Sequence, residues 1–578
     1  MKINKQLLPF IIIIGIILVV GGYAIYRNIE KQGIKEIKTT EDIDTKINTD
    51  DGDEKIDWDS YEKTDITEEN GMTITKAGTY NLTGEINGSI TVKTTGNVKL
   101  VLNNVTIKSS TGPAIIIEEA ENIVIYLTEG TTNTLEDSSS YSYSDEDING
   151  VIYSKDDLIF EGEGTLVINS NYQDGIVSKD DLKIINGTYK INSIDDGIRG
   201  KDSVYILNGN FDITSGGDAI KSTNDTDTEK GYILIENGNF EIESELDGVQ
   251  AETKLVIKNG NFNIKTGGGS SNSSSNNNEW GKWGRNPYEQ TTTNTSSAKG
   301  LKSVDNLVIN NGTFTFDTSD DSIHSNNYVG IKNGNINISS GDDGIHADTE
   351  LIIDSGTINI TKSYEGLESA KMTINNGNIS VVASDDGINI AGGNDSSSMN
   401  RPGQNNYSNN SDNILTINNG TIYVNATGDG IDINGSGYMY DGKVTVDGPT
   451  NNGNGTLDYD REFVVDGGTF IGAGSNGMLQ NVSSTKQYNA TISLSNSYES
   501  NTEVSILDSN NNVIISYTPT KTFSSIIIST PKLKQNETYT VKINNETYTT
   551  FTTTSYSTYV GTSGGMMNGG GHQPPGRR

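Results

Sequence analysis

Acidic side chains recur at a fixed interval along the middle of this chain, and carboxylates arranged in this way can bind cations. In most copies an acid is followed by glycine and an aliphatic residue, with about 22 residues between copies. Stacked carboxylates repel each other by about 1 kcal/mol per pair in water and by several times more inside a protein. Protons, water or cations must therefore compensate them. The acids of this column are Asp174, Asp196, Asp218, Asp247, Asp321, Asp343, Glu365, Asp386 and Asp429, with Lys299 in one position.

Calcium is the expected cofactor, because a hard divalent cation takes roughly six to eight oxygen ligands. The predicted ligands lie where consecutive repeats are richest in acids: Asp342, Asp343, Glu365, Glu368, Asp385 and Asp386, with Asp320, Asp321, Asp195 and Asp196 in addition. Aspartate before glycine is also a common turn residue, so half of the column could serve the backbone alone. The chain contains neither an EF-hand loop nor a glycine-rich nonapeptide calcium repeat.

A second column follows the aliphatic residue of each copy and is expected to point outward. It changes from basic to acidic along the chain: Val177, Arg199, Lys221, Gln250, Lys302, His324, His346, Glu368, Asn389 and Asp432. Two neighbouring histidines beside acids could bind a transition metal. Solvent-exposed spacer residues are the favoured interpretation of His324 and His346.

Short strands must position these columns. An Asn-Gly pair recurs with the same interval, and apolar residues alternate with polar ones on both sides of it, as in Phe240/Ile242 and Phe262/Ile264. Alternation in runs of four or five residues is typical of strands with one buried face. A 22-residue repeat predicts three strands per turn of a single-stranded parallel β-helix, in which equivalent residues stack from turn to turn. We expect this domain to span residues 67–482, with insertions at 267–298 and 391–412.

Composition agrees with a long, thin core. Hydrophobic residues make up only 32% of the 578 residues, while 65 are glycine and 9 are proline. The formal net charge of −35 argues against a nucleic-acid partner and favours cations, or ligands that reach the surface through cations. No cysteine is present, which excludes disulfides, thiolate nucleophiles and cysteine metal sites.

The N-terminus predicts a membrane anchor. Residues 7–26 contain no charge and are long enough to span a bilayer as a helix. Lys2 and Lys5 favour a cytoplasmic N-terminus. We therefore expect residues 1–31 to form a cytoplasmic tip and transmembrane signal anchor, 32–66 a flexible acidic stalk, and the rest to be extracellular at the cell membrane. A cleaved signal peptide is the alternative.

The remaining segments have weaker signals. The insertion at 267–298 contains Trp280, Trp283 and Tyr288, whose rings could stack on sugars; two flexible low-complexity loops are the alternative for both insertions. Residues 483–560 lose the 22-residue period and are expected to form a C-terminal β cap or a small β-sandwich. Residues 561–578 are Gly-rich and are expected to be disordered.

The repeats SGDDGIHADTELIIDSGTINITKSYEGLESAKMTINNGNISVVASDDGINIAGGN at 340–394 closely resemble the bacterial carbohydrate-binding β-helix family, which is described as binding cellulose and acidic sugars. The resemblance covers roughly residues 67–555. It implies a right-handed, pectate-lyase-like parallel β-helix, several calcium ions on the DDG acids and on Glu365 and Glu368, and extracellular polysaccharide binding without catalysis. Lys299 and Ser322 depart from the family pattern in their repeats.

Three functions are therefore distinguished. The leading hypothesis is a non-catalytic, monomeric, membrane-anchored protein that binds polysaccharide, either acidic sugars such as polygalacturonate through calcium, or cellulose. The second is a calcium-dependent polysaccharide lyase, with Arg199, Lys221 or Lys302 as the base. The third is a structural spacer or adhesin.

Overall fold

Strands account for nearly all the regular structure of the chain. The computed structural model describes residues 38–44, 46–47, 56–66, 69–143, 147–273, 297–391 and 413–561. Within these ranges it contains 48 strands, three short 3-10 helices (η1 Thr40–Asp42, η2 Trp58–Ser60, η3 Ser270–Asn272) and no α-helix. The all-β prediction is confirmed.

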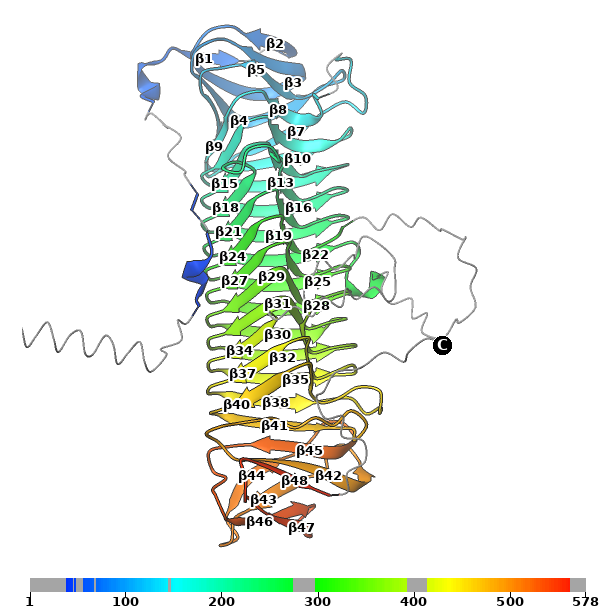
Figure 1. The fold of residues 1–578 in the computed structure, drawn as a ribbon. Helices are drawn as coiled ribbons and strands as arrows, with labels where there is room; N and C mark the ends of the chain where they lie inside the picture. The colour runs from blue at the N-terminus through cyan, green and yellow to red at the C-terminus, as the bar shows by residue number, and fades with distance from the viewer. Residues whose placement is uncertain are drawn as a thin grey trace, which may run out of the picture. The chain divides into compact units, whose positions relative to one another are not determined.

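The strands form a coil in which each strand pairs in parallel with the equivalent strand of the next turn (Figure 1). Thus β13 (Thr188–Ser193) pairs with β16 (Asn210–Ser215), and β16 pairs with β19 (Asn239–Ser244). The register keeps equivalent residues opposite each other, for example Phe211 beside Phe240. This is the parallel β-helix arrangement that the repeat predicts, while its right-handed sense stays a prediction.

Each turn of the coil contributes one strand to each of three faces. The first face follows the Asn-Gly turns and consists of β7 (Thr132–Glu136), β10 (Thr165–Asn169), β13, β16, β19, β22 (Asn261–Thr266), β25 (Thr313–Thr318), β28 (Asn335–Ser340), β30 (Thr357–Lys362), β32 (Asn378–Ala383), β35 (Thr421–Ala426), β38 (Lys443–Asp447) and β41 (Thr469–Gly474). The second face follows the acid-glycine corner and consists of β5 (Ile115–Glu119), β8 (Gly150–Ser154), β11 (Asp174–Ser178), β14 (Ile198–Gly200), β17 (Ile220–Ser222), β20 (Val249–Ala251), β23 (Leu301–Ser303), β26 (Ile323–Ser325), the first halves of β29 (Ile345–Ile353) and β31 (Leu367–Ile374), β33 (Ile388–Ile390), β36 (Ile431–Ile433) and β39 (Asp458–Tyr459).

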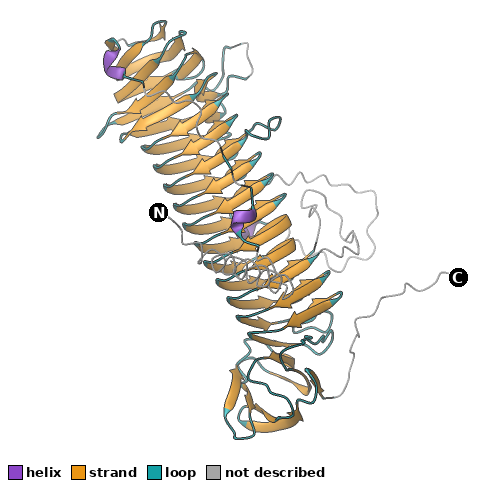
Figure 2. Cartoon of the chain, turned by 60° about the vertical axis from the view of Figure 1, so that its left-hand side comes forward, coloured by secondary structure: helices purple, strands orange, loops and turns teal. Residues whose placement is uncertain are grey.

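The third face completes each turn. It consists of β6 (Ile123–Leu127), β9 (Leu158–Gly162), β12 (Asp181–Ile184), β15 (Ser203–Ile206), β18 (Tyr232–Ile235), β21 (Lys254–Ile257), β24 (Asn306–Ile309), β27 (Tyr328–Ile331), the second halves of β29 and β31, β34 (Ile414–Ile417), β37 (Ser436–Met439) and β40 (Glu462–Val465). Figure 2 shows the strands of successive turns stacked on one another.

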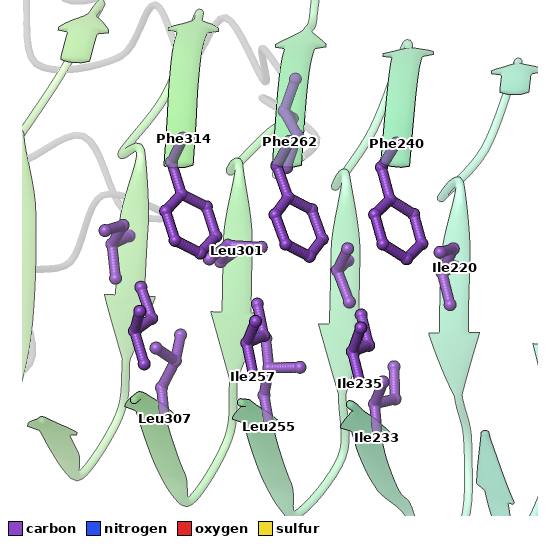
Figure 3. Packing of buried hydrophobic residues seen from close by; sticks show 14 of the residues in the cluster. Ile220, Ile233, Ile235, Phe240, Leu255, Ile257, Phe262, Leu301, Leu307 and Phe314 are labelled. Carbon is purple, nitrogen blue, oxygen red and sulfur yellow. The ribbon is translucent and has the colours of Figure 1, made fainter. Parts of the chain in front are cut away.

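The core is a set of side-chain ladders inside the coil. Tyr189, Phe211, Phe240, Phe262 and Phe314 stack in sequence, with neighbouring centroids 4.4–5.1 Å apart and ring planes within 8° of parallel. Figure 3 shows three of these rings above rows of leucine and isoleucine. Identical residues stack well because one turn repeats the backbone of the last at about 4.8 Å.

Both ends of the coil are covered by further strands. At the start, β1 (Lys63–Ile66) and β2 (Asn70–Ile74) pair with β3 (Gly78–Lys93), which continues into β4 (Val98–Lys108). At the end, β45 (Phe523–Ser529) adds antiparallel to β41 and also pairs with β42 (Asn489–Tyr498), which pairs with β48 (Ser557–Val560). An uncovered last strand would expose unpaired backbone groups. A separate antiparallel sheet contains β43 (Val504–Leu507), β44 (Val513–Tyr517), β46 (Thr538–Ile543) and β47 (Glu546–Thr552).

Residues 39–44 and 46–47, which we call the strap, lie against the third face. Ile43 packs with Val308, Ile352 and Tyr328, and the Thr40 backbone N–H and hydroxyl donate to the Asp354 carboxylate at 2.9 and 2.6 Å. The strap belongs to the segment 32–66 that we expected to be a flexible stalk, but these contacts attach it to the coil. The strap is seated by packing and hydrogen bonds together.

The segment predicted to be a membrane anchor, residues 7–26, lies outside the described ranges. Among the residues that are described, no helix has the length and apolar character needed to cross a membrane. The anchor and the predicted domain boundaries stay predictions.

Candidate functional site

The acids of the first column form a continuous ladder at the corner between the first and second faces. We call Asp174, Asp196, Asp218, Asp247, Asp321, Asp343, Glu365, Asp386 and Asp429 the acid ladder. In the rungs where the bond is present, one carboxylate oxygen accepts the backbone N–H of the equivalent residue one turn later, at 2.5–3.1 Å. This explains why the sequence repeats an acid here: it satisfies a backbone donor at a tight corner. The other oxygen is left for a side-chain partner.

That partner is in the second column, which we call the companion ladder: Val177, Arg199, Lys221, Gln250, Lys302, His324, His346, Glu368, Asn389 and Asp432. Parallel pairing places each member opposite the next. Each also follows an acid-ladder position by three residues. The two ladders therefore run side by side along the coil.

The prediction that His324 and His346 are solvent-exposed is wrong. His324 and His346 are only 5% and 1% exposed, and Gln250, Glu368 and Asn389 are buried as well. These side chains point away from the apolar core, but stacking at the spacing of successive turns and the neighbouring acid ladder cover them. They form a polar layer beneath the surface.

In the first half of the coil, bases of the companion ladder pair with the acids. Arg199 Nη2 lies 2.7 Å from Asp174 Oδ2, and Lys302 Nζ lies 3.0 Å from Asp247 Oδ2. Lys221 likewise lies 2.6 Å from Asp218. These bases compensate the acids in part, and burial still raises the pKa of Asp174 to about 7 and that of Asp218 to about 6.

Lys299, which replaces an acid in its ladder position, is also paired. Its ammonium lies 2.6 Å from Asp321 Oδ2 and 2.9 Å from Asp320 Oδ1. Burial alone would lower the pKa of Lys299, but the two carboxylates raise it well above its usual range. Burial would likewise raise the pKa of Asp321, but Lys299 and His324 hold it well below the ordinary value. The Lys299 ammonium group thus compensates the two carboxylates of this turn in place of a metal ion.

In the second half, lysine and arginine no longer pair with the acids of the two ladders. Glu365, Glu368, Asp386, Asp429 and Asp432 follow one another in the two ladders, and within the described ranges none of them has a lysine or arginine at ion-pair distance. We call these five residues the base-free acid cluster.

Burial and electrostatic repulsion act together on the carboxyl groups of this cluster. Burial, followed by the charges of neighbouring carboxylates, raises the pKa of Asp386 and of Asp432 to about 8 and that of Asp429 to about 6. Burial also raises the pKa of Glu368 to about 7 although His346 opposes the shift, and that of Glu365 well above its usual value. Carboxyl groups with such pKa values bind protons or cations at neutral pH.

Asn389 lies within the cluster and carries an unsatisfied atom. Its amide donates to Glu365 Oε2 at 2.7 Å and to Glu368 Oε1 at 3.3 Å. Its Oδ1 is buried and has no hydrogen-bond partner among the described residues. A buried acceptor of this kind beside carboxylates matches an all-oxygen ligand set for a hard cation.

The predicted metal ligands are therefore distributed over different environments. The structure brings Glu365 close enough to Asp343, Glu368 and Asp386 for their charges to raise its pKa. Asp342 is close to Asp343, Asp321 and Asp320, and burial together with these charges raises its pKa well above the ordinary value. Asp195 and Asp196 group with Asp174, and Asp385 interacts with the Tyr364 hydroxyl.

Two features of the site were not predicted from the sequence. Asp429 and Asp432 belong to the base-free acid cluster and Asn389 lies beside it; their positions in the two repeating columns were the signal that could have identified them. The pairs of Arg199 with Asp174 and of Lys302 with Asp247 join successive turns, so the spacing along the sequence does not reveal them. The predicted sugar-binding residues Trp280, Trp283 and Tyr288 lie outside the described residues.

Comparisons with known proteins relate part of this coil to a family. Residues 68–344 match the family model described as carbohydrate-binding domain-containing protein. A curated protein of the same description from Acetivibrio thermocellus is 33% identical over 161 residues, which are 27% of this chain and 55% of that protein. The chain thus spans about half the length of this curated relative.

A solved structure is also similar. It is titled as the polysaccharide lyase-like protein from C. thermocellum, in a gadolinium derivative, and is 34% identical to this chain. The alignment covers 35% of this chain and 84% of that one, with a TM-score of 0.34. Residues 68–344, slightly less than half of the chain, are thus similar to the carbohydrate-binding domain-containing protein family.

Proposed function

We propose that this protein is a non-catalytic, polysaccharide-binding surface protein, anchored by residues 7–26, whose coil holds calcium in the base-free acid cluster. The observation that carries the binding proposal is the family match of residues 68–344, since this family and the curated relative are both described as carbohydrate-binding.

The first face of the coil offers a surface for a sugar chain. A groove of about 300 Å³ runs over β13, β16, β19, β22 and β25. It is lined by polar side chains, including Asn210, Asn239 and Asn261, and by the aromatic residues Tyr189, Phe211, Phe240 and Phe262. Asn261 donates to Asn239, and Asn239 to Asn210, both at 2.8 Å. Each amide in such a row keeps a further donor and a lone pair, which match the hydroxyl groups of a glycan.

Calcium fits the base-free acid cluster on the chemistry of its donors. Glu365, Glu368, Asp386, Asp429 and Asp432 supply carboxylate oxygens and Asn389 an amide oxygen that lacks another partner. A bound calcium ion supplies the positive charge that these residues lack. It can also coordinate the carboxylate of an acidic sugar that reaches the ion. An acidic polysaccharide such as polygalacturonate needs such a cation, because the net charge of the chain is −35. A neutral chain such as cellulose does not.

The lyase alternative requires a free base beside the substrate. Arg199, Lys221 and Lys302 are each paired with a buried carboxylate. Burial would lower the pKa of Lys221, but Asp218 and Asp196 raise it. A base that holds its proton this firmly is poorly suited to abstract one from a sugar, which favours the binding proposal over catalysis.

The test is a glycan panel of neutral and acidic polysaccharides, probed with the chain from residue 32 onward in calcium and in excess chelator. We expect binding to at least one polysaccharide and no unsaturated product absorbing in the near ultraviolet. Asp386→Asn should weaken chelator-sensitive binding, while Asn239→Ala should weaken binding that survives chelator. Binding to no polysaccharide in either condition would refute the proposal and favour a spacer or adhesin. Unsaturated product would favour the lyase.

A further inference from the structure

His324 and His346 form a stacked pair in the middle of the companion ladder. They lie opposite each other on β26 and β29, with ring centroids 4.9 Å apart and ring planes at 24°. Both rings are buried. Buried imidazole nitrogens need partners, so the surroundings of each nitrogen indicate what the pair does.

The two rings are oriented in the same way. Nε2 of His324 lies 2.9 Å from Asn326 Oδ1, and Nε2 of His346 lies 3.0 Å from Asp348 Oδ1. Both partners are acceptors, so each Nε2 carries a hydrogen that it donates. In a neutral ring the lone pair is then on Nδ1. Metal-binding histidines show this arrangement, in which an outer oxygen fixes the tautomer.

Each Nδ1 faces carboxylates. His324 Nδ1 lies 2.8 Å from Asp321 Oδ2, and His346 Nδ1 lies 3.2 Å from Asp343 Oδ2 and 3.0 Å from Glu368 Oε2. A nitrogen lone pair and an anionic oxygen repel each other unless a proton or a metal ion lies between them. Asp321 is already paired with Lys299, so Asp343 and Glu368 are the carboxylates left for an ion.

The donor atoms also converge. A ring nitrogen of each histidine and an oxygen of Asp321 lie within 4.8 Å of one another, and so do the donors of His346, Asp343 and Glu368. One imidazole with two carboxylates suits zinc and its first-row neighbours, whereas calcium prefers oxygen alone. We propose that His346 Nδ1, Asp343 and Glu368 bind one divalent first-row transition metal ion, while His324 stacks on His346 from the preceding turn. Glu368 faces His346 with Oε2, and its Oε1 accepts from Asn389. This inference does not rest on polysaccharide binding.

The competing arrangement places a proton on Nδ1 of His346. The imidazolium would then pair directly with Asp343 and Glu368, and no metal would be needed. The two arrangements differ in an observable way, because only the first gives a metal ion bound through imidazole nitrogen.

The test measures zinc binding to metal-stripped protein by equilibrium dialysis in excess calcium, with zinc-edge X-ray absorption on the wild-type protein. We expect one zinc ion per chain with imidazole scattering from one histidine. The paired substitution His324→Gln and His346→Gln should abolish it, while His572→Gln, which removes the remaining histidine of the chain, should leave it unchanged. Asp348→Ala should weaken zinc binding roughly 10–100-fold through the outer hydrogen bond, and Asp348→Asn much less.

Two results would overturn the proposal. One is a wild-type protein that binds no zinc in excess calcium. The other is bound zinc whose absorption spectrum lacks imidazole scattering, which would assign the ion to carboxylates elsewhere even if the histidine variants failed to fold. Neither result bears on the glycan panel, so this proposal and the binding proposal fail separately.

Discussion

Asp386→Asn should stabilise the coil when calcium is absent and remove its stabilisation by calcium. Asp386 Oδ1 accepts the backbone N–H of Asp429 at 2.5 Å, and an asparagine Oδ1 keeps that bond. The substitution therefore removes a charge from the base-free acid cluster while leaving the corner of the turn intact.

The magnitude follows from the pKa. The pKa of Asp386 rises from 3.8 to about 8, through burial and then the charges of Asp432 and Asp385. At pH 7 this carboxyl group is ionised in the unfolded chain and must take up a proton when the chain folds. Because pH 7 lies about three units above the unfolded pKa, and each unit corresponds to about 1.4 kcal/mol, this uptake destabilises the folded state. The gain in unfolding free energy should thus reach about 4 kcal/mol as an upper value, since the side chain keeps some contact with water, which screens its charge.

Asp321→Asn is the matched control. It occupies the same ladder position and accepts the equivalent backbone N–H at 2.9 Å, but its second oxygen pairs with Lys299. Removing one partner of a buried pair costs about 3–5 kcal/mol, so this variant should be destabilised. The two substitutions are chemically identical and should act with opposite signs.

The assay is urea unfolding followed by circular dichroism, with hydrogen exchange of the β33 and β36 amides to localise the effect. Both are measured in chelator and in millimolar calcium. If Asp386→Asn destabilised the calcium-free protein as Asp321→Asn does, the cluster would already be compensated and the electrostatic reasoning would be wrong.

Three further predictions concern the same framework. In chelator, the unfolding free energy should decrease as pH rises from about 4 to 8. The raised pKa values of Glu368, Asp386 and Asp432 mean that the native state binds more protons than the unfolded state in this range. Calcium should make the unfolding free energy depend less on pH, and a stability that rises with pH would contradict the prediction. Phe240→Ala should cost about 3–5 kcal/mol in unfolding free energy, and Phe240→Leu roughly 1–3 kcal/mol for its two ring contacts, by urea unfolding; equal losses would show that stacking contributes little. Gly330→Val should expel the strap and expose it to limited proteolysis, since a Cβ there would lie 2.6 Å from Ile43 Cδ1; an unchanged cleavage pattern would indicate another seating.

Much of the fold could be predicted because the repeat is strict. Residues 22 apart, such as Phe240 and Phe262, must have equivalent places in a coil, and the alternation on either side of each Asn-Gly turn identifies the buried face. The acid ladder could be predicted for the same reason. Its partners could not, because the pairing of Arg199 with Asp174 depends on which way a long side chain leans between turns.

Two features were not predicted: the burial of His324 and His346, and the packing of the strap against the coil. Alternation separates core from surface, but it does not reveal that His346 is covered by its own ladder neighbours. The strap has a signal in hindsight. Gly330 interrupts a row in which Val308 and Ile352 are the adjacent members, and the segment before the coil contains Ile43 and Ile47 among polar residues.

The strap has a consequence for the cooperativity of the coil. Turns of a solenoid normally contact only their immediate neighbours, so stability propagates by nearest-neighbour coupling. Here one short segment touches Asp354 on one turn, Lys254 through Asp44, and Tyr232, Leu234 and Val256 through Ile47 on earlier turns. The strap therefore links turns that are not adjacent to one another. Opening any turn that the strap contacts must weaken its contacts with the others, so the turns beneath the strap should unfold as one unit.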